Sequence, residues 1–531
     1  MKTKRNIVLV LLLLSTLFFS SCSTVQPLPN TKRQCLLQKP TQTSATLEKY
    51  LYKTDKTLAG HSAFYPLALP QDALTARLFL IDHAQKSIDV QYYIYENDTI
   101  GALFSYHLYL AALRGVKVRI LLDDISTTGK DKELISLSQH QNIELKLFNP
   151  NRFRTIFRNL ALLLDINTLG KRMHNKALIV DNYAAIIGGR NIGDVYYASH
   201  PKTLFLDYDV LIIGKVVPEI SDSFNIYWNS KEAYFAQDIL DTDENEPLAQ
   251  AKQSLCLKIQ KFQTSQRAKL LKDAPFTDAL KQDKLIFTVA RQTNLFYDLP
   301  NKVTSDENNN THHISKQISE ELKEVDKELL IISPYFIPSE ALMQRFRELR
   351  KKGVKITVIT NSLASTDVFP VYGGYVSYIK PLTQMGVQIY ELKATLLQDM
   401  PKKKKFKKPP ALSLHTKLLF FDNKRIAIGS ANIDPRSEKL NTELLVIVTS
   451  TSLTTQEKKY VKSLISLKNF YEVSWGKLPK GPFDDGIQHY GPIYTTLENN
   501  HIKHYYTPPK ASFFKRLGAN ISRLLPIEGY L

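Results

Sequence analysis

The stretch MHNKALIVDNYAAIIGGRN, residues 173–191, decides the fold of the chain. An apolar run stands on each side of the turn signal Asp181-Asn182, so the stretch predicts a β-hairpin. Side chains two apart on a strand share a face, and therefore His174 and Lys176 point to the same side. The return strand ends in Gly-Gly-Arg-Asn and brings Asn191 back beside them. The hairpin is therefore expected to gather an imidazole, an ammonium group and an amide in one place.

The pattern occurs a second time, as LHTKLLFFDNKRIAIGSAN at residues 414–432. Both copies fit His-x-Lys-x4-Asp-x6-Gly-[Gly/Ser]-x-Asn. Each position would match by chance about once in twenty, so two copies in one chain are not a coincidence. The identical pairs are His174 and His415, Lys176 and Lys417, Asp181 and Asp422, Gly188 and Gly429, and Asn191 and Asn432.

The repeat extends beyond the two motifs. Residues 87–124 and residues 327–361 each show an apolar strand, a helical pattern, Gly-Val-Lys and a second apolar strand. The offset is about 240 residues for this unit as well as for the motif, which predicts a tandem duplication of an α/β domain. The expected segments are a signal peptide at 1–22, a linker at 23–60, a first domain at 61–283 with a helical connector at 232–283, and a second domain at 284–531.

The N-terminus predicts export. Basic residues precede an apolar run at 7–19, and the run ends in Ser-Ser-Cys-Ser, which resembles a bacterial lipoprotein box with Cys22 as the acylated residue. A retained membrane anchor is the alternative. The prediction is a lipid-tethered protein of the bacterial cell envelope on the periplasmic side, and Ser23 favours the outer membrane. Only Cys35 and Cys256 then remain, so no disulfide framework is expected.

Charge predicts an anionic partner. The 531 residues are 43% hydrophobic and 23% charged, which indicates a globular protein, and the formal net charge is +19. The basic loop at 401–410 places six lysines around one phenylalanine, which suits anionic lipid headgroups, with a solvated loop or a nucleic-acid patch as alternatives.

The C-terminal stretch SFFKRLGANISRLLP, residues 512–526, predicts an amphipathic helix. Such a helix either lies in a membrane interface or docks on the protein's own core. The apolar residues that share one arc of its helical wheel are Phe513, Phe514, Leu517, Ile521, Leu524 and Leu525.

Two such motifs in one chain suit phosphodiester chemistry. A neutral imidazole attacks phosphorus, and a second, protonated imidazole donates to the leaving oxygen. Two lysines and two asparagine amides then hold the nonbridging oxygens without a metal or other cofactor. Each imidazole needs a carboxylate on its other nitrogen. Asp209 and Glu443 are the candidates, with Asp207 as an alternative to Asp209. A hairpin that merely binds an anion is the alternative for a single motif.

The paired motifs resemble the phospholipase D superfamily, and in particular its bacterial cardiolipin synthases of the C type. The segments that carry the closer resemblance are MHNKALIVDN, IIGGRNIGDVYY, NSLASTDVFPVYGGY and GSANIDPRSEKLNTEL. The resemblance implies two α/β/α sandwich domains related by a pseudo-twofold, with the active site in the cleft between them and a phosphohistidine intermediate. It implies that His174 is the nucleophile, that His415 is the acid and later the base, and that Arg190 stands where relatives carry a small residue.

The same resemblance assigns phosphate binding to the two lysines and the two asparagines, and the turn positions make Asp181 and Asp422 structural supports. The predicted activity is phosphatidyl transfer between membrane phospholipids, phosphatidylglycerol and phosphatidylethanolamine. A phospholipase D hydrolase is the first alternative, and a secreted nuclease is the second, disfavoured by export. The oligomeric state stays open.

Overall fold

The fold is that of a computed structural model, which describes residues 47–58, 60–127, 130–150, 170–200, 202–240, 248–305, 313–395, 410–479 and 487–524. The predicted signal peptide with Cys22 lies outside the described residues, as does the basic loop apart from Pro410.

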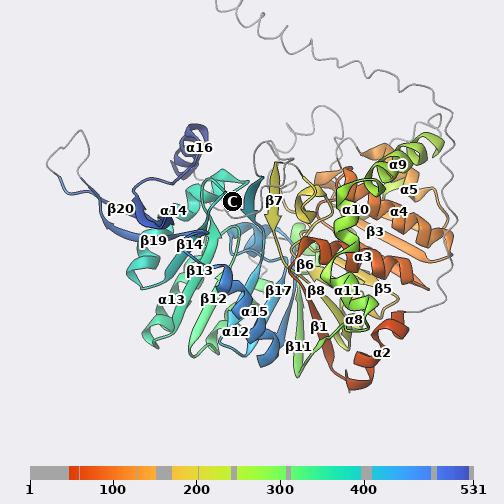
Figure 1. The fold of residues 1–531 in the computed structure, drawn as a ribbon, viewed down its shortest axis with the longest axis horizontal. Coiled ribbons are helices and arrows are strands. Elements are labelled where there is room, and N and C mark those ends of the chain that lie inside the picture. Colours follow the sequence, from red (N-terminus) through yellow and green to blue (C-terminus); the bar gives the residue numbers. More distant parts are fainter. Residues whose placement is uncertain are drawn as a thin grey trace, which may run out of the picture. The chain divides into compact units, whose positions relative to one another are not determined.

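The first half of the chain forms a nine-stranded sheet in the order β10-β1-β8-β6-β5-β2-β3-β4-β9. Strands β2, β3 and β4 are parallel to one another, and the other pairs are antiparallel (Figure 1). The strands are β1 (Ser62–Leu67), β2 (Ser87–Tyr92), β3 (Lys117–Asp123), β4 (Ile143–Phe148), β5 (Ala177–Val180), β6 (Ala184–Gly188), β8 (Asp209–Gly214), β9 (Ala233–Phe235) and β10 (Thr288–Ala290).

The second half forms a ten-stranded sheet in the order β11-β18-β17-β16-β12-β13-β14-β19-β20-β21, again with three parallel strands, β12, β13 and β14. From β11 to β19 this order matches that of the first sheet from β1 to β9, as a duplication requires. The strands are β11 (Gln292–Tyr297), β12 (Glu328–Ile332), β13 (Lys355–Asn361), β14 (Gln388–Leu392), β16 (Leu418–Phe421), β17 (Arg425–Gly429), β18 (Leu444–Thr449), β19 (Phe470–Lys477), β20 (Tyr490–Glu498) and β21 (His501–Tyr505).

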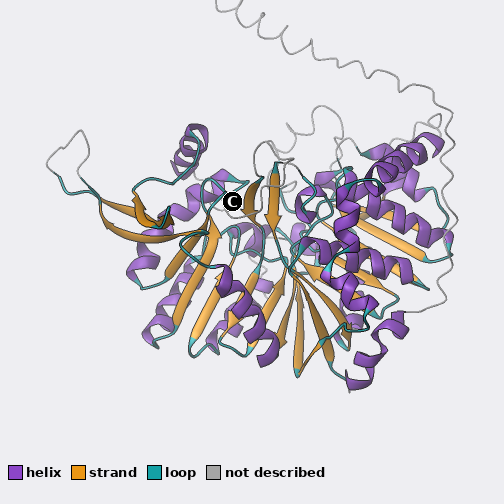
Figure 2. Cartoon of the chain, in the orientation of Figure 1, coloured by secondary structure: helices purple, strands orange, loops and turns teal. Residues whose placement is uncertain are grey.

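Helices cover the sheets (Figure 2). None of those in the described part of the chain is long and apolar enough to span a bilayer. The helices of the first half and connector are α2 (Leu47–Leu58), α3 (Pro70–His83), α4 (Thr99–Leu113), α5 (Asp131–Ser138), α8 (Val216–Trp228), α9 (Leu248–Gln263), α10 (Gln266–Lys272) and α11 (Pro275–Lys281). Those of the second half are α12 (Ile314–Lys323), α13 (Glu340–Lys351), α14 (Phe369–Gln384), α15 (Thr451–Leu464) and α16 (Phe513–Leu524). Short turns are η1 (Asp124–Ser126), η2 (Asp194–Tyr197), η3 (Ala236–Asp238), η4 (Pro300–Val303) and η5 (Arg436–Leu440).

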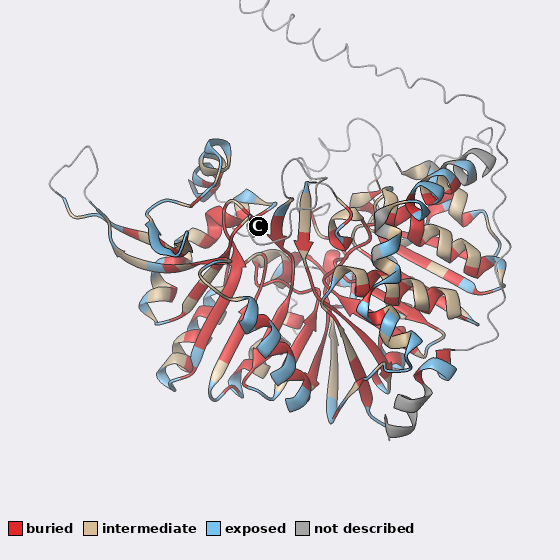
Figure 3. Ribbon diagram, in the orientation of Figure 1, coloured by how far each residue is buried: buried red, intermediate tan, exposed pale blue. Residues whose placement is uncertain are grey.

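The two sheets share one apolar core. Successive strand residues point to opposite faces, so Ala63 packs with α3 and α4 while Phe64 packs in a cluster with α8 and with strands of the second sheet. Leu330 of the second sheet belongs to that shared cluster, whereas Leu329 packs on the α12 and α13 side. Buried residues accordingly follow the strands (Figure 3). Burial on both faces explains why these strands are continuously apolar in sequence.

The repeat units end their helices in the same way. Gly115 after α4 has a φ of 96°, and Gly353 after α13 has a φ of 83°. A left-handed residue after the last helical turn favours glycine, because a Cβ would be strained there. The Gly-Val-Lys element of each unit therefore stops a helix and starts β3 or β13.

The chain crosses between the sheets at Arg291, a few residues after the predicted boundary at 283 and 284. The segment 232–283 begins with β9 and then holds α9, α10 and α11. Cys256 in α9 is buried.

Candidate active site

The two aspartates of the motifs fix the hairpin turns. Asp181 and Asp422 both have a φ of 56°, which places them in the left-handed region. The Asp181 carboxylate accepts the backbone N–H groups of residues 85–87, which lead into β2. The Asp422 carboxylate accepts those of residues 326–328, which lead into β12. Each carboxylate thus ties its hairpin to the neighbouring strand and acts as a structural support.

The histidines lie just before the hairpin strands, because β5 begins at Ala177 and β16 at Leu418. Their backbone N–H groups are bonded to the opposite half of the molecule. The N–H of His174 donates to the carbonyl of Thr442 at 2.8 Å, and that of His415 donates to the carbonyl of Leu206 at 2.7 Å. The segments that carry the two histidines pair with segments of the opposite half. At these residues this pairing replaces the hydrogen bonds between the two strands of the hairpin. The hairpin prediction therefore began its strands too early.

The carboxylates that hold the imidazoles also cross between the halves. Nδ1 of His174 lies 2.9 and 2.8 Å from the two carboxylate oxygens of Glu443. Nδ1 of His415 lies 2.5 Å from Oδ2 of Asp207. A parallel pair of strands, β7 (Thr203–Leu206) and β15 (Ala411–Leu414), leads into the second contact. Each histidine is thus held by the half that does not carry it.

Asp209 is not the partner of a histidine, and the preference for it over Asp207 was wrong. Its carboxylate lies 2.9 Å from Arg77 and 3.1 Å from the Arg190 guanidinium. Arg190 also donates to the backbone carbonyl of Asp207 at 2.6 Å. Arg190, which departs from the family pattern, is therefore buried in the first half, where it forms an ion pair with Asp209. The second half carries Ala431 at the corresponding position and has no such arginine there.

The two lysines lie against the histidines of their own motifs. Nζ of Lys176 donates to the His174 carbonyl at 2.6 Å, and Nζ of Lys417 donates to the His415 carbonyl at 2.5 Å. Both side chains are buried. Since these bonds leave each ammonium group two further protons, both can still donate to phosphate oxygens.

The two asparagines differ in their surroundings. Asn191 Oδ1 accepts the N–H of Ile94 at 3.1 Å, and its Nδ2 donates to the hydroxyl of Tyr196 at 2.8 Å. Asn432 donates its backbone N–H to Ser437, while its buried Oδ1 has no partner among the residues that the structure describes. The two halves therefore present different amide groups to the site.

Burial sets the electrostatics of the site. It lowers the pKa of His174 well below 6.5, and Lys176, Lys417 and His415 lower this pKa further. Burial also lowers the pKa of His415, with Lys417 adding and Asp207 opposing. The pKa of Lys176 falls to about 7, again chiefly through burial. Because groups of both motifs shift one another's pKa values, they share one site.

Hydrogen bonds from two serines hold the Glu443 carboxylate in place. Most of the contacts of Glu443 were not predicted from the sequence. The hydroxyls of Ser430 and Ser437 both donate to its carboxylate. Its N–H donates to Asp298 at 2.9 Å, and Asp298 is paired with Lys302 at 3.0 Å. The Gly-Ser of the second motif is the sequence signal that could have identified Ser430. Asp298, which lies far from either motif, carries no such signal.

Aromatic rings restrain both imidazoles. The ring of Tyr93 meets His174 edge-on, with centroids 4.9 Å apart. Phe205 stacks on His415 with centroids 5.2 Å apart, and Tyr196 meets His415 edge-on. These residues come from the ends of strands and from η2, so only the fold brings them together. Within the described residues, no group of three or more His, Cys, Asp or Glu side chains is placed to hold a metal ion.

Comparison with known families agrees with this geometry. The family described as "Cardiolipin synthase, PLD-like domain" matches residues 78–228 and residues 318–465, which covers one motif in each match. The chain belongs to this family. The predictions of the phospholipase D superfamily and of two tandem α/β domains are thereby confirmed.

Two relatives match nearly the whole chain. "Cardiolipin synthase C" of Escherichia coli (strain K12) is 34% identical over 477 residues, which cover 89% of this chain and 97% of that protein. An uncharacterized protein of Helicobacter pylori (strain J99) is 33% identical and covers 97% of this chain and 98% of its own length. The crystal structure of phosphatidylserine synthase from Haemophilus influenzae has a TM-score of 0.53 at 13% identity, covers 79% of this chain and 91% of that one, and shares the fold.

Proposed function

We propose that this chain is a phosphatidyltransferase that acts on membrane phospholipids through a phosphohistidine intermediate. The observation that carries the proposal is the reciprocal arrangement of the two histidines. Each imidazole has a carboxylate at Nδ1, which leaves Nε2 for chemistry, and both stand beside buried lysines. The relative named cardiolipin synthase C supports this reaction class.

The reaction has two steps. Nε2 of His174 attacks phosphorus of the donor lipid, the bond from phosphorus to the head alcohol breaks, and His415 gives its proton to the departing oxygen. The phosphatidyl group is then bound to His174. In the second step His415 takes the proton of an acceptor hydroxyl, whose oxygen attacks phosphorus and releases His174. The nucleophile and the acid are assigned by family resemblance, and exchanging them leaves the chemistry unchanged.

The remaining side chains hold the phosphate. Lys176 and Lys417 donate to the nonbridging oxygens, whose negative charge grows in each transition state. The amide groups of Asn191 and Asn432 stand at the ends of the same hairpins and add donors. Preorganised charges in a buried site stabilise the transition state more than they would in water.

Phosphatidylethanolamine and phosphatidylglycerol are the proposed substrates, and cardiolipin is the proposed product. The purified full-length chain, added to vesicles of these two lipids, is expected to form cardiolipin that mass spectrometry detects. Phosphatidic acid as the sole product would identify a hydrolase instead. No change in any lipid would contradict the proposal and would make DNA the next substrate to test. Lipidation of Cys22, with attachment to the cell envelope, remains part of the proposal.

Transfer is expected to be fastest in mildly acidic solution. The pKa of His174 lies well below 6.5, so this imidazole stays neutral and nucleophilic there. The pKa of His415 is also lowered, so its proton is lost as pH rises past that value. Deprotonation of Lys176, with a pKa of about 7, adds to the loss. A bell-shaped kcat/KM profile with a maximum below 6.5 is expected, and a flat profile between about pH 5 and 8 would contradict the assignment.

The profile of kcat is expected to lie at higher pH than that of kcat/KM. A bound phosphodiester carries a negative charge, which favours the imidazolium and ammonium forms and raises their pKa values. The kcat profile reports the complex, whereas kcat/KM reports the free enzyme. Measuring both on the same vesicles separates the two states.

Helix α16 supports contact with an anionic membrane surface. It docks on α14 through small residues, because a Cβ at Gly373 would lie 2.6 Å from the carbonyl of Ala519. Its apolar stripe points away from that contact, with Phe513 71% exposed and Phe514 81% exposed. The docked face thus uses small residues, and the described residues of the predicted apolar face, Phe513, Phe514, Leu517 and Ile521, are exposed. An exposed aromatic stripe on a cationic helix suits a lipid interface.

Replacing Phe513 and Phe514 by serine together is expected to reduce binding to anionic vesicles at least about tenfold, because burying each ring is worth roughly 1.5–3 kcal/mol. Vesicle sedimentation measures the loss. Ile286→Ser is the matched control, since Ile286 is 78% exposed and lies far from α16 in the sequence. Equal binding by the double variant and the control would exclude α16 from the interface.

A further inference from the structure

The N–H group of the residue before each motif histidine is buried and points away from the opposite half of the molecule. The N–H groups of His174 and His415 donate across to that half, and successive N–H groups along an extended chain point to opposite sides. The preceding N–H groups, those of Met173 and Leu414, therefore point back toward their own half. Both residues are buried, so each N–H group needs a partner within the protein.

Each of these N–H groups is bound by the residue that ends the second strand of its repeat unit. Oδ2 of Asp123, the last residue of β3, accepts the N–H of Met173 at 2.8 Å. Oδ1 of Asn361, the last residue of β13, accepts the N–H of Leu414, also at 2.8 Å. Asp123 and Asn361 are equivalent positions, because each stands six residues after the lysine of Gly-Val-Lys. The duplication has thus kept the contact while the residue type changed.

The surroundings of Asp123 contain hydrogen-bond donors. Its Oδ1 accepts the N–H of Ile125 at 2.9 Å and lies 3.5 Å from the Arg172 guanidinium. Both oxygens of the side chain therefore act as acceptors, which suits an ionised carboxylate because it has no proton to donate. An asparagine has only one oxygen, so it could not accept both backbone N–H groups.

The surroundings of Asn361 contain acceptors as well as donors. Its Oδ1 also accepts the hydroxyl of Ser365 at 2.9 Å, and its Nδ2 donates to the carbonyl of Leu414 at 2.9 Å. The amide therefore binds Leu414 through both its N–H and its carbonyl. An ionised carboxylate could not do so, because it would place a second oxygen against that carbonyl.

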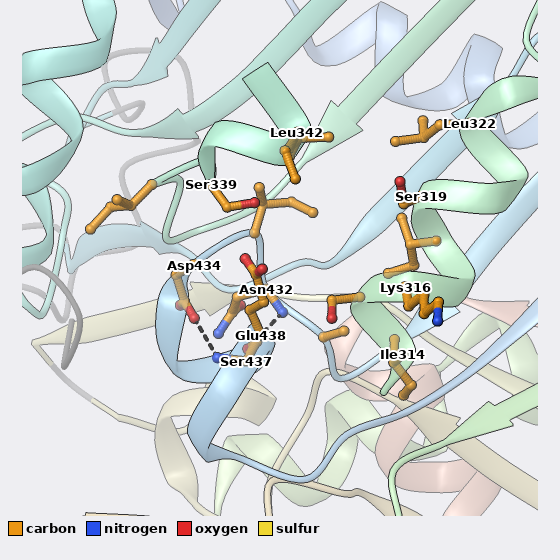
Figure 4. Close-up of a pocket in the computed structure, with 16 residues that line it drawn as sticks. Ile314, Lys316, Ser319, Leu322, Ser339, Leu342, Asn432, Asp434, Ser437 and Glu438 are labelled. Carbon is orange, nitrogen blue, oxygen red and sulfur yellow. Dashed lines mark hydrogen bonds between the residues drawn. The ribbon is translucent and has the colours of Figure 1, made fainter. Parts of the chain in front are cut away.

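Neighbouring polar side chains of the second motif do not replace this contact. Asn432, Asp434 and Ser437 line a pocket beside that motif, and Figure 4 shows hydrogen bonds among them. The N–H of Asn432 donates to the Ser437 hydroxyl at 3.1 Å, and the N–H of Ser437 donates to Asp434 at 2.7 Å. The residue before His415 is fixed by Asn361 instead.

We propose that Asp123 and Asn361 are positioning residues, one for each catalytic histidine. Each fixes the backbone directly before a histidine from its own half, while Glu443 and Asp207 fix the imidazoles from the opposite half. The placement of Nε2 against phosphorus depends on both attachments, and a small misplacement of a reacting group slows a reaction strongly. This inference rests on the proposed function and adds the residues that orient its two histidines.

Asp123→Asn tests the first attachment. The Arg172 guanidinium faces Oδ1, so the amide oxygen is expected to stay on that side, and the amide NH2 group then faces the N–H of Met173. The variant thus loses this contact at nearly constant volume. Asp124→Asn is the matched control, because Asp124 is also buried but its carboxylate accepts the hydroxyl of Thr127.

Asn361→Leu tests the second attachment. Leucine has a similar size but can neither accept the N–H of Leu414 nor donate to its carbonyl. Thr360→Val is the matched control, because Thr360 is equally buried and its hydroxyl donates to the carbonyl of Pro334. Ser365→Ala removes only the hydroxyl that holds Oδ1 of Asn361, so it is expected to give the same effect at smaller size.

The leaving group of the donor separates the two histidines. Phosphatidylethanolamine needs a proton on its departing oxygen, whereas a phosphatidyl p-nitrophenol releases a stable phenolate without one. Vesicles of either donor are mixed with the full-length chain, which is then denatured in detergent at mildly alkaline pH. The phosphatidyl adduct on histidine is measured as a function of time.

The two variants are expected to respond differently to the donor. Asp123→Asn should slow adduct formation at least about tenfold with both donors, because attack by His174 is needed in each case. Asn361→Leu should slow it at least about tenfold with phosphatidylethanolamine but by no more than about twofold with the activated donor. The adduct should then persist in Asn361→Leu, because His415 also activates the acceptor. The reverse pattern would support the same pairing of residues with the two histidine roles exchanged.

Several results would overturn the inference while the proposed function stands. One is equal slowing of folded Asn361→Leu with both donors, which indicates a merely structural role. Another is an Asp123→Asn variant no slower than Asp124→Asn. If Asp123→Asn does not fold, Asp123→Glu keeps the charge beside Arg172 and moves the carboxylate by one methylene, and it should show the same loss. No turnover of either donor by wild type would overturn the proposed function and this inference with it.

Discussion

Alanine in place of His174 is expected to reduce phosphatidyl transfer by at least about a thousandfold, because the covalent step loses its nucleophile. The side chain is buried and is held by Glu443, so no neighbouring group can take over its position. Product formation in phosphatidylethanolamine and phosphatidylglycerol vesicles, followed by mass spectrometry, measures the loss. Covalent labelling gives a second readout: wild type denatured in detergent at mildly alkaline pH during turnover, where a phosphorus–nitrogen bond survives, is expected to carry a phosphatidyl group on histidine.

The matched comparison is His415→Ala. If His174 is the nucleophile, His415→Ala still forms some covalent adduct with a donor whose leaving group needs no proton, whereas His174→Ala forms none. The reverse pattern would exchange the two roles. Full transfer by His174→Ala would refute the phosphohistidine mechanism.

Asparagine in place of Asp207 is expected to reduce kcat by roughly 10²- to 10⁴-fold, as loss of a carboxylate behind a catalytic imidazole typically does. Oδ2 of Asp207 lies 2.5 Å from Nδ1 of His415, so it fixes which ring nitrogen carries the proton and stabilises the imidazolium. Asparagine keeps the shape but removes the charge, so the pKa of His415 is expected to fall further. The pH–rate profile of the variant should move toward acid, which a purely structural defect would not produce.

The neighbouring carboxylate supplies the control. Asp209→Asn removes the charge that pairs with Arg77 and Arg190, both buried. Breaking such a pair costs about 3–5 kcal/mol of folding free energy. Thermal unfolding of Asp209→Asn is therefore expected at a clearly lower temperature, whereas Asp207→Asn should lose more activity than stability. An activity loss of equal size in both variants, with equal stability, would contradict the division of roles.

The sequence predicted the duplicated sheet well, because the signals involved are local. Turn residues at Asp181 and Asp422, apolar runs on both sides of them, and Gly115 and Gly353 after the two helices each act within a few residues. The strand orders of the two sheets follow from repeating the same unit. The start of the hairpin strands at Ala177 was missed, because a contact from the other half displaced the local ladder.

The histidine partners were harder to predict because they depend on long-range contacts. Asp207 and Asp209 differ by two residues and share a face of an extended strand, so spacing could not separate them. Arg190 distinguishes the two aspartates, because its guanidinium pairs with the Asp209 carboxylate and leaves Asp207 as the partner of His415. The sequence showed Arg190 as a departure from the family pattern, but it did not show which carboxylate the Arg190 side chain contacts.

The exchange of carboxylates between the halves has a consequence for how the enzyme must be built. Neither half contains both members of a histidine–carboxylate pair, since Glu443 of the second half contacts His174 of the first, and Asp207 of the first half contacts His415 of the second. Two separate copies would have to meet before either could react, and their activity would then depend on concentration. Joining them in one chain makes that meeting intramolecular, with an effective concentration in the millimolar range for a short flexible connection. The joined enzyme thus remains active on dilution, and a single break between the halves is expected to make its activity second order in the fragments.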